Sequence, residues 1–210
     1  MKKCLNGGVI IVISYDVQLL ERAFKMFNTI YFNGELPTPI LTIQTSPRCN
    51  GYITTTKIWK SSEDSYYEIN ISAENISRPI EQVYGTLIHE MTHLFCMINN
   101  IKHVSNLGRY HSKVFKTEAE ARGLIIQYAK TIGWSVTSPS AELIQVIKDN
   151  GLYENIEHAR VTKESEGNKI KKPSSTRKYV CSHCNTSVRA TKTVNILCLD
   201  CNNVMTVSTQ

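Results

Sequence analysis

The sequence predicts an α+β protein in which helices pack on a small antiparallel sheet, followed by a small module built on four cysteines. Three observations carry this prediction. Apolar residues recur at helical spacing in residues 14–32 and 79–98, which is typical of helices with one buried face. Short runs between them alternate apolar and polar residues, as half-buried strands do. Two C-x-x-C pairs lie close together near the end, in a segment too short to build a large core.

The first half of the chain should form one helix and several short strands. Ser14 suits the start of a helix, and Asn33-Gly34 suits its end. Residues 1–13 are expected to form a tail or a short strand. Strand-like runs follow at residues 40–43, 52–53, 57–60 and 67–71. In the last run Glu68 and Asn70 alternate with apolar residues, which predicts a strand with one buried face.

The second half should be mostly helical. A helix begins near Pro79, because proline is favoured in the first turn, and it ends at Asn99. Another starts around His111. Gly123 interrupts it, and the apolar run over residues 124–129 is expected to continue it or to form a short further helix. One more helix is expected over residues 141–148, and the pattern assigns no role to the rest of residues 130–160.

Composition excludes several classes of protein. The chain has 210 residues, of which 41% are hydrophobic and 20% charged, a balance typical of folded globular proteins. No apolar run approaches the roughly 18–20 residues of a membrane span, so we expect no membrane contact. The run Val9–Ile13 follows two lysines, but it is too short for a signal peptide and no cleavage site follows it. We therefore expect a cytoplasmic protein.

Residues 89–93 read His-Glu-Met-Thr-His, an H-E-x-x-H pattern inside the second expected helix. Positions i and i+4 share one helix face, so His89 and His93 can bind the same ion. Imidazole nitrogen suits zinc, and Glu90 stands where it can take a proton from a zinc-activated water. The pattern predicts a catalytic zinc site that attacks a carbonyl. A purely structural helix is the weaker interpretation, because buried polar side chains need partners.

A catalytic zinc usually has three protein ligands and one open position, so a third ligand must come from elsewhere. The extended pattern H-E-x-x-H-x-x-G-x-x-H is excluded, because Cys96 and Asn99 occupy its last two fixed positions. The downstream candidates are His103, His111, Glu118 and Glu120. We favour His111, at the start of an expected helix. His103 lies in a polar connection and is expected to be exposed, whereas Glu118 or Glu120 is the alternative.

Three segments together resemble the SprT-like metallopeptidases, a group that includes eukaryotic proteases of DNA–protein crosslinks. They are Phe32-Asn33-Gly34-Glu35-Leu36-Pro37, Thr86 to His93, and Gly108 to Phe115. The resemblance covers residues 14–125 and 179–205, and only Asn99–Leu107 departs from the family's pattern within the first stretch. It implies a zincin-like domain over residues 14–159, zinc-dependent peptide hydrolysis with Glu90 as general base, and His111 as third zinc ligand.

The second cluster of candidate ligands contains only cysteines. Cys181-Ser-His-Cys184 and Cys198-Leu-Asp-Cys201 are separated by thirteen residues. Four thiolates close a tetrahedral zinc site, so we predict a structural Cys4 zinc ribbon over residues 179–210, as the resemblance also implies. Metal binding would supply the stability that such a short segment lacks. A pair of redox dithiols is the alternative interpretation.

Basic residues gather ahead of and within the expected ribbon. The net charge is +6, and nine basic residues fall between Arg160 and Lys192 against two glutamates. Residues 160–178 are expected to form a basic linker. A basic face with Tyr179 as a stacking surface suits single-stranded nucleic acid, so DNA is the expected partner beside a protein substrate.

The sequence supports a leading hypothesis and an alternative, with an enzyme that makes no nucleic-acid contact as a third possibility. The leading hypothesis is a zinc metalloendopeptidase that hydrolyses DNA-associated or DNA-crosslinked proteins, with one catalytic and one structural zinc. The alternative is a nucleic-acid-binding zinc-ribbon protein whose zincin domain is not catalytic. Glu90 favours the enzyme, because a purely structural metal site has no need of an acid beside its ligands.

Overall fold

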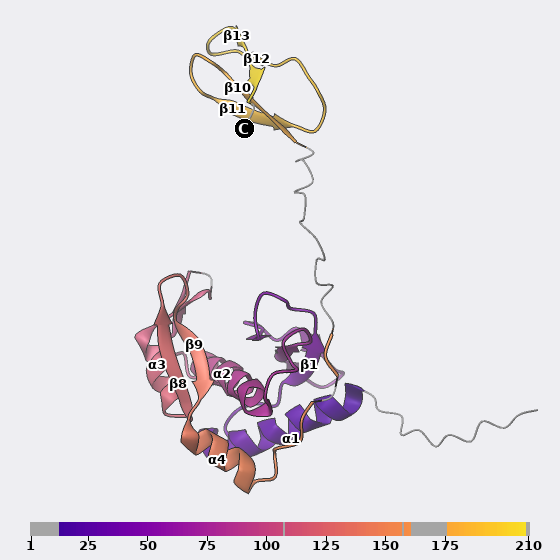
Figure 1. Cartoon of the computed structure of the whole chain (residues 1–210), viewed down its shortest axis with the longest axis vertical. Coiled ribbons are helices and arrows are strands. Elements are labelled where there is room, and N and C mark those ends of the chain that lie inside the picture. Colours follow the sequence, from indigo (N-terminus) through magenta and orange to yellow (C-terminus); the bar gives the residue numbers. More distant parts are fainter. Residues whose placement is uncertain (1–12, 107, 157, 161–175, 209–210) are drawn as a thin grey trace, which may run out of the picture. The chain divides into compact units, whose positions relative to one another are not determined.

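The computed structural model describes residues 13–106, 108–156, 158–160 and 176–208. The chain divides into two compact units, Met1–Thr162 and Lys163–Gln210, and each is described by itself (Figure 1). The expected tail over residues 1–13 and the basic linker over residues 160–178 lie almost wholly outside the described residues. No helix in the described ranges is long and apolar enough to cross a membrane.

In its described residues the larger unit has four helices: α1 (Ile13–Phe32), α2 (Ile80–Ile98), α3 (Lys113–Glu120) and α4 (Ala141–Asp149). Their positions agree with the sequence pattern. α1 ends where Asn33 and Gly34 take positive φ angles of 54° and 74°. Helix α2 is the centre of the core and contacts the other three helices and the strands on both sides of it. Phe27 of α1 meets Tyr84 of α2 edge-on at 5.6 Å.

The first sheet has the order β1-β5-β2, from β1 (Ile40–Gln44), β5 (Glu68–Ser72) and β2 (Gly51–Ile53). β1 runs parallel to β5, whereas β2 runs antiparallel to it. The sheet is therefore mixed rather than purely antiparallel, although the α+β class is confirmed. A small hairpin of β3 (Trp59–Lys60) and β4 (Ser65–Tyr66) interrupts the connection from β2 to β5.

Strand β5 is buried on both faces, so the prediction of one buried face was wrong. The carboxylate of Glu68 is 3% exposed and accepts hydrogen bonds from Thr42 Oγ1 at 2.8 Å, Tyr52 OH at 3.1 Å and Trp59 Nε1 at 2.6 Å. These donors come from β1, β2 and the β3–β4 hairpin, which together cover the second face. Polar residues can occupy that face because each finds a partner there.

The second sheet has the order β6-β7-β9-β8. Its strands are β6 (Val104–Ser105), β7 (Tyr110–His111), β8 (Leu124–Ala129) and β9 (Gly133–Pro139). The prediction of a helix over residues 124–129 was wrong. Leu124 and Ile126 are each 3% exposed whereas Ile125 between them is 46% exposed, so the run has the period of a strand. Pairing with β9 makes this run a strand, and a short apolar run does not by itself predict a pairing with a distant segment.

The smaller unit is a set of short antiparallel pairs. β10 (Arg177–Val180) pairs with β11 (Ser187–Ala190) and β14 (Thr206–Val207), and β12 (Leu197–Cys198) pairs with β13 (Asn203–Val204). Its core consists of Tyr179, Cys181, Cys198 and Met205. Such a core is too small to hold the unit together without a metal or another staple.

Candidate metal centre

Three histidines converge at one end of the larger unit. α2 presents His89 and His93 one turn apart, and β7 brings His111 opposite them. The Nε2 atom of His93 lies 3.2 Å from that of His89 and 3.0 Å from that of His111, and the third separation is 3.3 Å. A tetrahedral zinc with Zn–N bonds of ~2.0–2.1 Å would separate its nitrogens by about 3.3 Å, so the spacing fits zinc.

The protonation of the histidines also fits a cation. Burial lowers the pKa of His89 to about 3, and it lowers the pKa of His93 and His111 as well. All three rings are therefore neutral near neutral pH, and each can offer a lone pair. The lone pairs of three neutral nitrogens packed this closely repel one another, and a bound cation would stabilise the arrangement. Among the described residues, no Asp or Glu belongs to this ligand cluster.

Phe115 forms the floor of the centre. Its side chain is completely buried, and its ring centroid lies 4.6, 4.5 and 4.8 Å from those of His89, His93 and His111. Phe115 reaches this place because Ser112 caps α3 and accepts a hydrogen bond from the Phe115 backbone N–H. The turn from His111 through Ser112 into α3 thus positions both the third candidate ligand, His111, and the phenylalanine beneath the three rings, Phe115.

Glu90 lies beside the triad but is not part of its ligand cluster. The residue is 5% exposed and lies close to β2. Gly51 of that strand has no side chain, and a Cβ added there would lie 3.4 Å from Glu90 Oε1 and 2.9 Å from both Asn70 O and Thr86 Cγ2. Burial raises the pKa of Glu90 to about 8, against the effect of a hydrogen bond from the Ile53 backbone. In the zinc-free protein the carboxyl is therefore largely protonated at neutral pH, and a cation bound beside it would favour the carboxylate that a general base must be.

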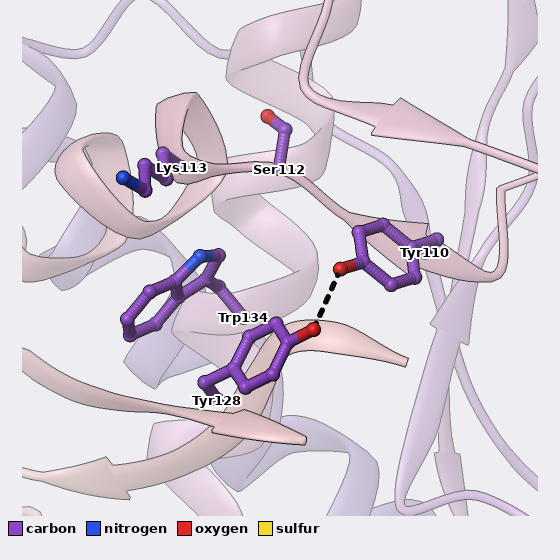
Figure 2. Close-up of a pocket in the computed structure, with 5 residues that line it drawn as sticks. All are labelled: Tyr110, Ser112, Lys113, Tyr128 and Trp134. Carbon is purple, nitrogen blue, oxygen red and sulfur yellow. Dashed lines mark hydrogen bonds between the residues drawn. The ribbon is translucent and has the colours of Figure 1, made fainter. Parts of the chain in front are cut away.

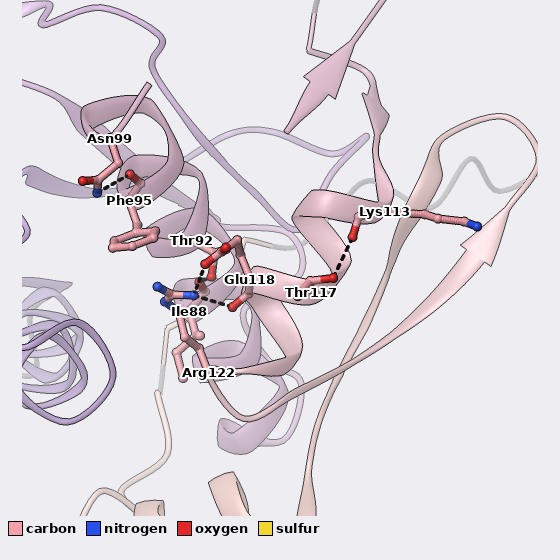
Figure 3. A network of polar contacts seen from close by, with 8 residues as sticks. All are labelled: Ile88, Thr92, Phe95, Asn99, Lys113, Thr117, Glu118 and Arg122. Atoms are coloured by element: carbon pink, nitrogen blue, oxygen red, sulfur yellow. Dashed lines mark hydrogen bonds and ion pairs between the residues drawn. The ribbon is translucent and has the colours of Figure 1, made fainter. Parts of the chain in front are cut away.

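The alternative third ligands point elsewhere. Glu118 pairs with Arg122, whose Nη1 donates to Glu118 Oε2 at 2.7 Å and to its carbonyl at 2.6 Å (Figure 3). The same guanidinium stacks over Phe95 at 4.0 Å. Glu120 lies 3.7 Å from Lys116. Among the described residues, only His111 joins the two helix histidines.

His103 is not exposed, so that prediction was wrong. It is 6% exposed, and its ring centroid lies 5.0 Å from that of His93. Its Nδ1 donates to the carbonyl of Ile101 at 2.8 Å. The polar composition of the connection suggested solvent, but the pairing of β6 with β7 turns His103 inward. His103 therefore packs beside His93 but does not belong to the ligand cluster.

The four predicted cysteines also converge. Cys181, Cys184, Cys198 and Cys201 place their sulfurs within 4.8 Å of one another, and the Sγ atoms of Cys184 and Cys198 lie 3.6 Å apart. Zn–S bonds of ~2.3 Å would separate tetrahedral sulfurs by about 3.8 Å. A hydrogen bond with the Thr186 side chain lowers the pKa of Cys184 to about 6, so one thiolate is available near neutral pH.

Tyr179 is not a stacking surface. It is 3% exposed within the core of the smaller unit, and its hydroxyl accepts a hydrogen bond from the Val194 backbone at 3.1 Å. The tyrosine was expected to face solvent because basic residues surround it in the sequence. Instead, β10 pairs with β11 on one side and β14 on the other, and Tyr179 lies in the core of the smaller unit.

An aromatic pocket lies in the larger unit, and sequence reasoning missed it. It has a volume of about 410 Å³ and is lined by Tyr110, Ser112, Lys113, Tyr128 and Trp134 (Figure 2). The rings of Tyr128 and Trp134 are 5.3 Å apart, and the hydroxyls of Tyr110 and Tyr128 are 3.1 Å apart. Alternate residues of an extended segment point to opposite sides, so Tyr110 and Ser112 face away from the side that presents His111.

Comparison with known proteins adds one finding. The SprT-like family profile matches residues 20–130, more than half of the chain, and this stretch contains all three histidines and Glu90. No curated protein and no solved structure matches the chain. The helix-borne histidine pair, the third histidine on β7 and the family match agree, and the chain belongs to the SprT-like family.

Proposed function

We propose that the protein is a zinc-dependent metallopeptidase. The observation that carries the proposal is the convergence of three neutral imidazole nitrogens at 3.0–3.3 Å, with the buried carboxyl of Glu90 beside them. The four cysteines would hold a second, structural zinc, because a site with four thiolates has no open position for substrate.

Each residue of the site would have a separate role in peptide hydrolysis. His89, His93 and His111 would hold the catalytic zinc, which supplies Lewis-acid activation of a water and of the scissile carbonyl. Glu90 takes the proton from the attacking water and returns it to the leaving amine. β2 is an edge strand of its sheet, and its residue Gly51 lies beside Glu90, so this edge offers a place where an extended peptide can align.

Hydrolysis of an unfolded protein such as casein by the zinc-loaded full chain tests the proposal. Wild type should cleave, and Glu90→Gln should lose at least about 100-fold in rate while still binding zinc. His93→Ala should lose both activity and zinc at the histidine centre. Zinc binding without any Glu90-dependent cleavage would instead support a nucleic-acid-binding protein with a non-catalytic zincin domain.

We further propose that single-stranded DNA is a partner and that DNA-associated proteins are the substrates. The net charge of +6 supports this, and so does the aromatic pocket. Proteins that bind single strands combine cations with aromatic faces on which bases stack. Lys113 lines the pocket without an ion pair to any described residue, and Lys116 lies over the Trp134 ring at 4.3 Å.

The two tryptophans of the chain make this partner measurable. In a Trp59→Phe background Trp134 is the sole reporter, and a dT oligonucleotide of about 15 nucleotides should quench its fluorescence. Tyr128→Ala should weaken binding, whereas Tyr153→Ala, at another exposed tyrosine, should not. Binding should fall steeply with salt. Quenching by casein peptides but not by DNA would make the pocket a peptide site.

A further inference from the structure

The pairing of β8 with β9 contains one irregularity close to the histidine centre. Gln127 pairs with Val136 and Tyr128 pairs with Trp134, so Ser135 has no partner residue on β8. This is a β-bulge, a feature that bends a strand and redirects the side chains next to it. The bulge lies two residues before Thr137.

The bulge supplies an acceptor to Thr137. The Thr137 hydroxyl donates its one hydrogen to the carbonyl of Ser135, at 3.1 Å. Its oxygen lies 2.8 Å from Nδ1 of His89. Because the hydroxyl hydrogen is already committed, the oxygen must accept, and His89 Nδ1 must be the donor. His89 is thereby held as the Nδ1–H tautomer, with the lone pair of Nε2 directed at the other two histidines.

His111 is held in the same way by the same hairpin. Its Nδ1 donates to the carbonyl of Ile132 at 3.3 Å, and its backbone N–H donates to that carbonyl at 3.0 Å. Two of the three histidines in the cluster are thus oriented by residues 132–137. These residues belong to the part of residues 130–160 for which the sequence pattern predicts no role.

We propose that Thr137 is a positioning residue of the metal centre, which sets the tautomer and ring orientation of His89 through a chain from Ser135 O to Thr137 Oγ1 to His89 Nδ1. This inference rests on the proposed zinc site. Partners that orient a metal-binding histidine raise its basicity, and their loss typically costs 10–100-fold in metal affinity. Thr137 touches neither metal nor substrate, so its effect should appear in zinc affinity before it appears in catalysis.

Zinc titration of the full chain against a chromophoric chelator tests the proposal. Thr137→Val removes the hydroxyl at nearly constant shape and should weaken the histidine site by about 10–100-fold. Thr137→Ser keeps the hydroxyl and should bind like wild type. Thr117→Val removes a hydroxyl that donates to Lys113 O within α3, away from the histidine cluster, and it is the matched control. The cysteine site should be unchanged in every variant.

The outcomes separate this inference from the proposed function. If His89→Ala loses zinc at the histidine site and Thr137→Val does not, the positioning role is wrong and the metal centre stands. If His89→Ala keeps full affinity, both fall. A second measurement needs no variant: long-range ¹H–¹⁵N NMR of the zinc-free wild type should show His89 protonated at Nδ1, and protonation at Nε2 would overturn the inference.

Discussion

The contact between Gly133 and the strand of the third histidine can be tested by one methyl group. Gly133 pairs with His111 and has a φ of +72°. A Cβ at this position would lie 2.2 Å from the carbonyl oxygen of His111 and 2.9 Å from the ring of Tyr110. Because such contacts need about 3.0 Å, Gly133→Ala must push β9 and β7 apart by about 0.8 Å.

The expected loss has two parts. A left-handed φ costs an alanine about 1–2 kcal/mol. Separating the strands weakens the hydrogen bond from His111 N to Ile132 O, which costs about 1 kcal/mol more. Gly34→Ala is the matched control, since Gly34 has a φ of +74° but nothing within 4 Å of its added Cβ. We therefore expect Gly133→Ala to lose about 2–3 kcal/mol and Gly34→Ala only the first part, about 1–2 kcal/mol.

Urea unfolding of the zinc-free protein measures this difference. Both tryptophans lie in the larger unit, so their fluorescence reports that unit alone. Zinc titration should also show a weaker histidine site in Gly133→Ala, because the strand that carries His111 has moved. Equal losses in the two variants, with unchanged zinc affinity, would refute the close approach of β9 to β7.

Three further changes test the packing, the ribbon and the buried acid. Phe115→Ala should lower the free energy of unfolding by about 3–5 kcal/mol, because the completely buried ring packs against all three histidines. Phe115→Leu should lower it by less than about 1.5 kcal/mol. Equal losses in urea titrations would contradict this. Cys181→Ser should reduce bound zinc from two ions to one and abolish the dispersed NMR signals of residues 176–208; a persistent ribbon spectrum would show that metal does not hold the unit together. Burial raises the pKa of Glu90 from its ordinary 4.5 to about 8, so the zinc-free fold keeps a proton that the unfolded chain releases, and its stability falls as pH rises between these values. Glu90→Gln removes this pH dependence while keeping the three histidines, so the excess of its unfolding free energy over that of wild type in urea should grow from pH 5 to pH 8.5. A constant difference would argue against a buried acid.

Several features of this protein follow from residues that are close together in the sequence. The spacing of His89 and His93 needs only one turn of helix to bring both rings to one side. The start of α2 after Pro79, its end at Asn99 and the end of α1 at Asn33-Gly34 depend on residues adjacent in the chain. The four cysteines likewise predict a metal site from their spacing, because each C-x-x-C pair brings two sulfurs together locally.

Other features were decided only when distant segments packed together. Leu124–Ala129 became a strand because β9 pairs with it, and His103 was buried because β6 pairs with β7. Tyr179 became core because β10 is the central strand of its sheet, paired with β11 on one side and β14 on the other. The contact from Thr137 to His89 joins residues 48 positions apart and depends on a bulge that sequence periodicity does not reveal. The sequence alone determined the candidate metal ligands, because that property belongs to side-chain chemistry and local spacing, but it left the third ligand open between His111 and Glu118 or Glu120. Only the tertiary structure decided how those ligands are oriented, since the groups that hold them come from non-local strand pairing.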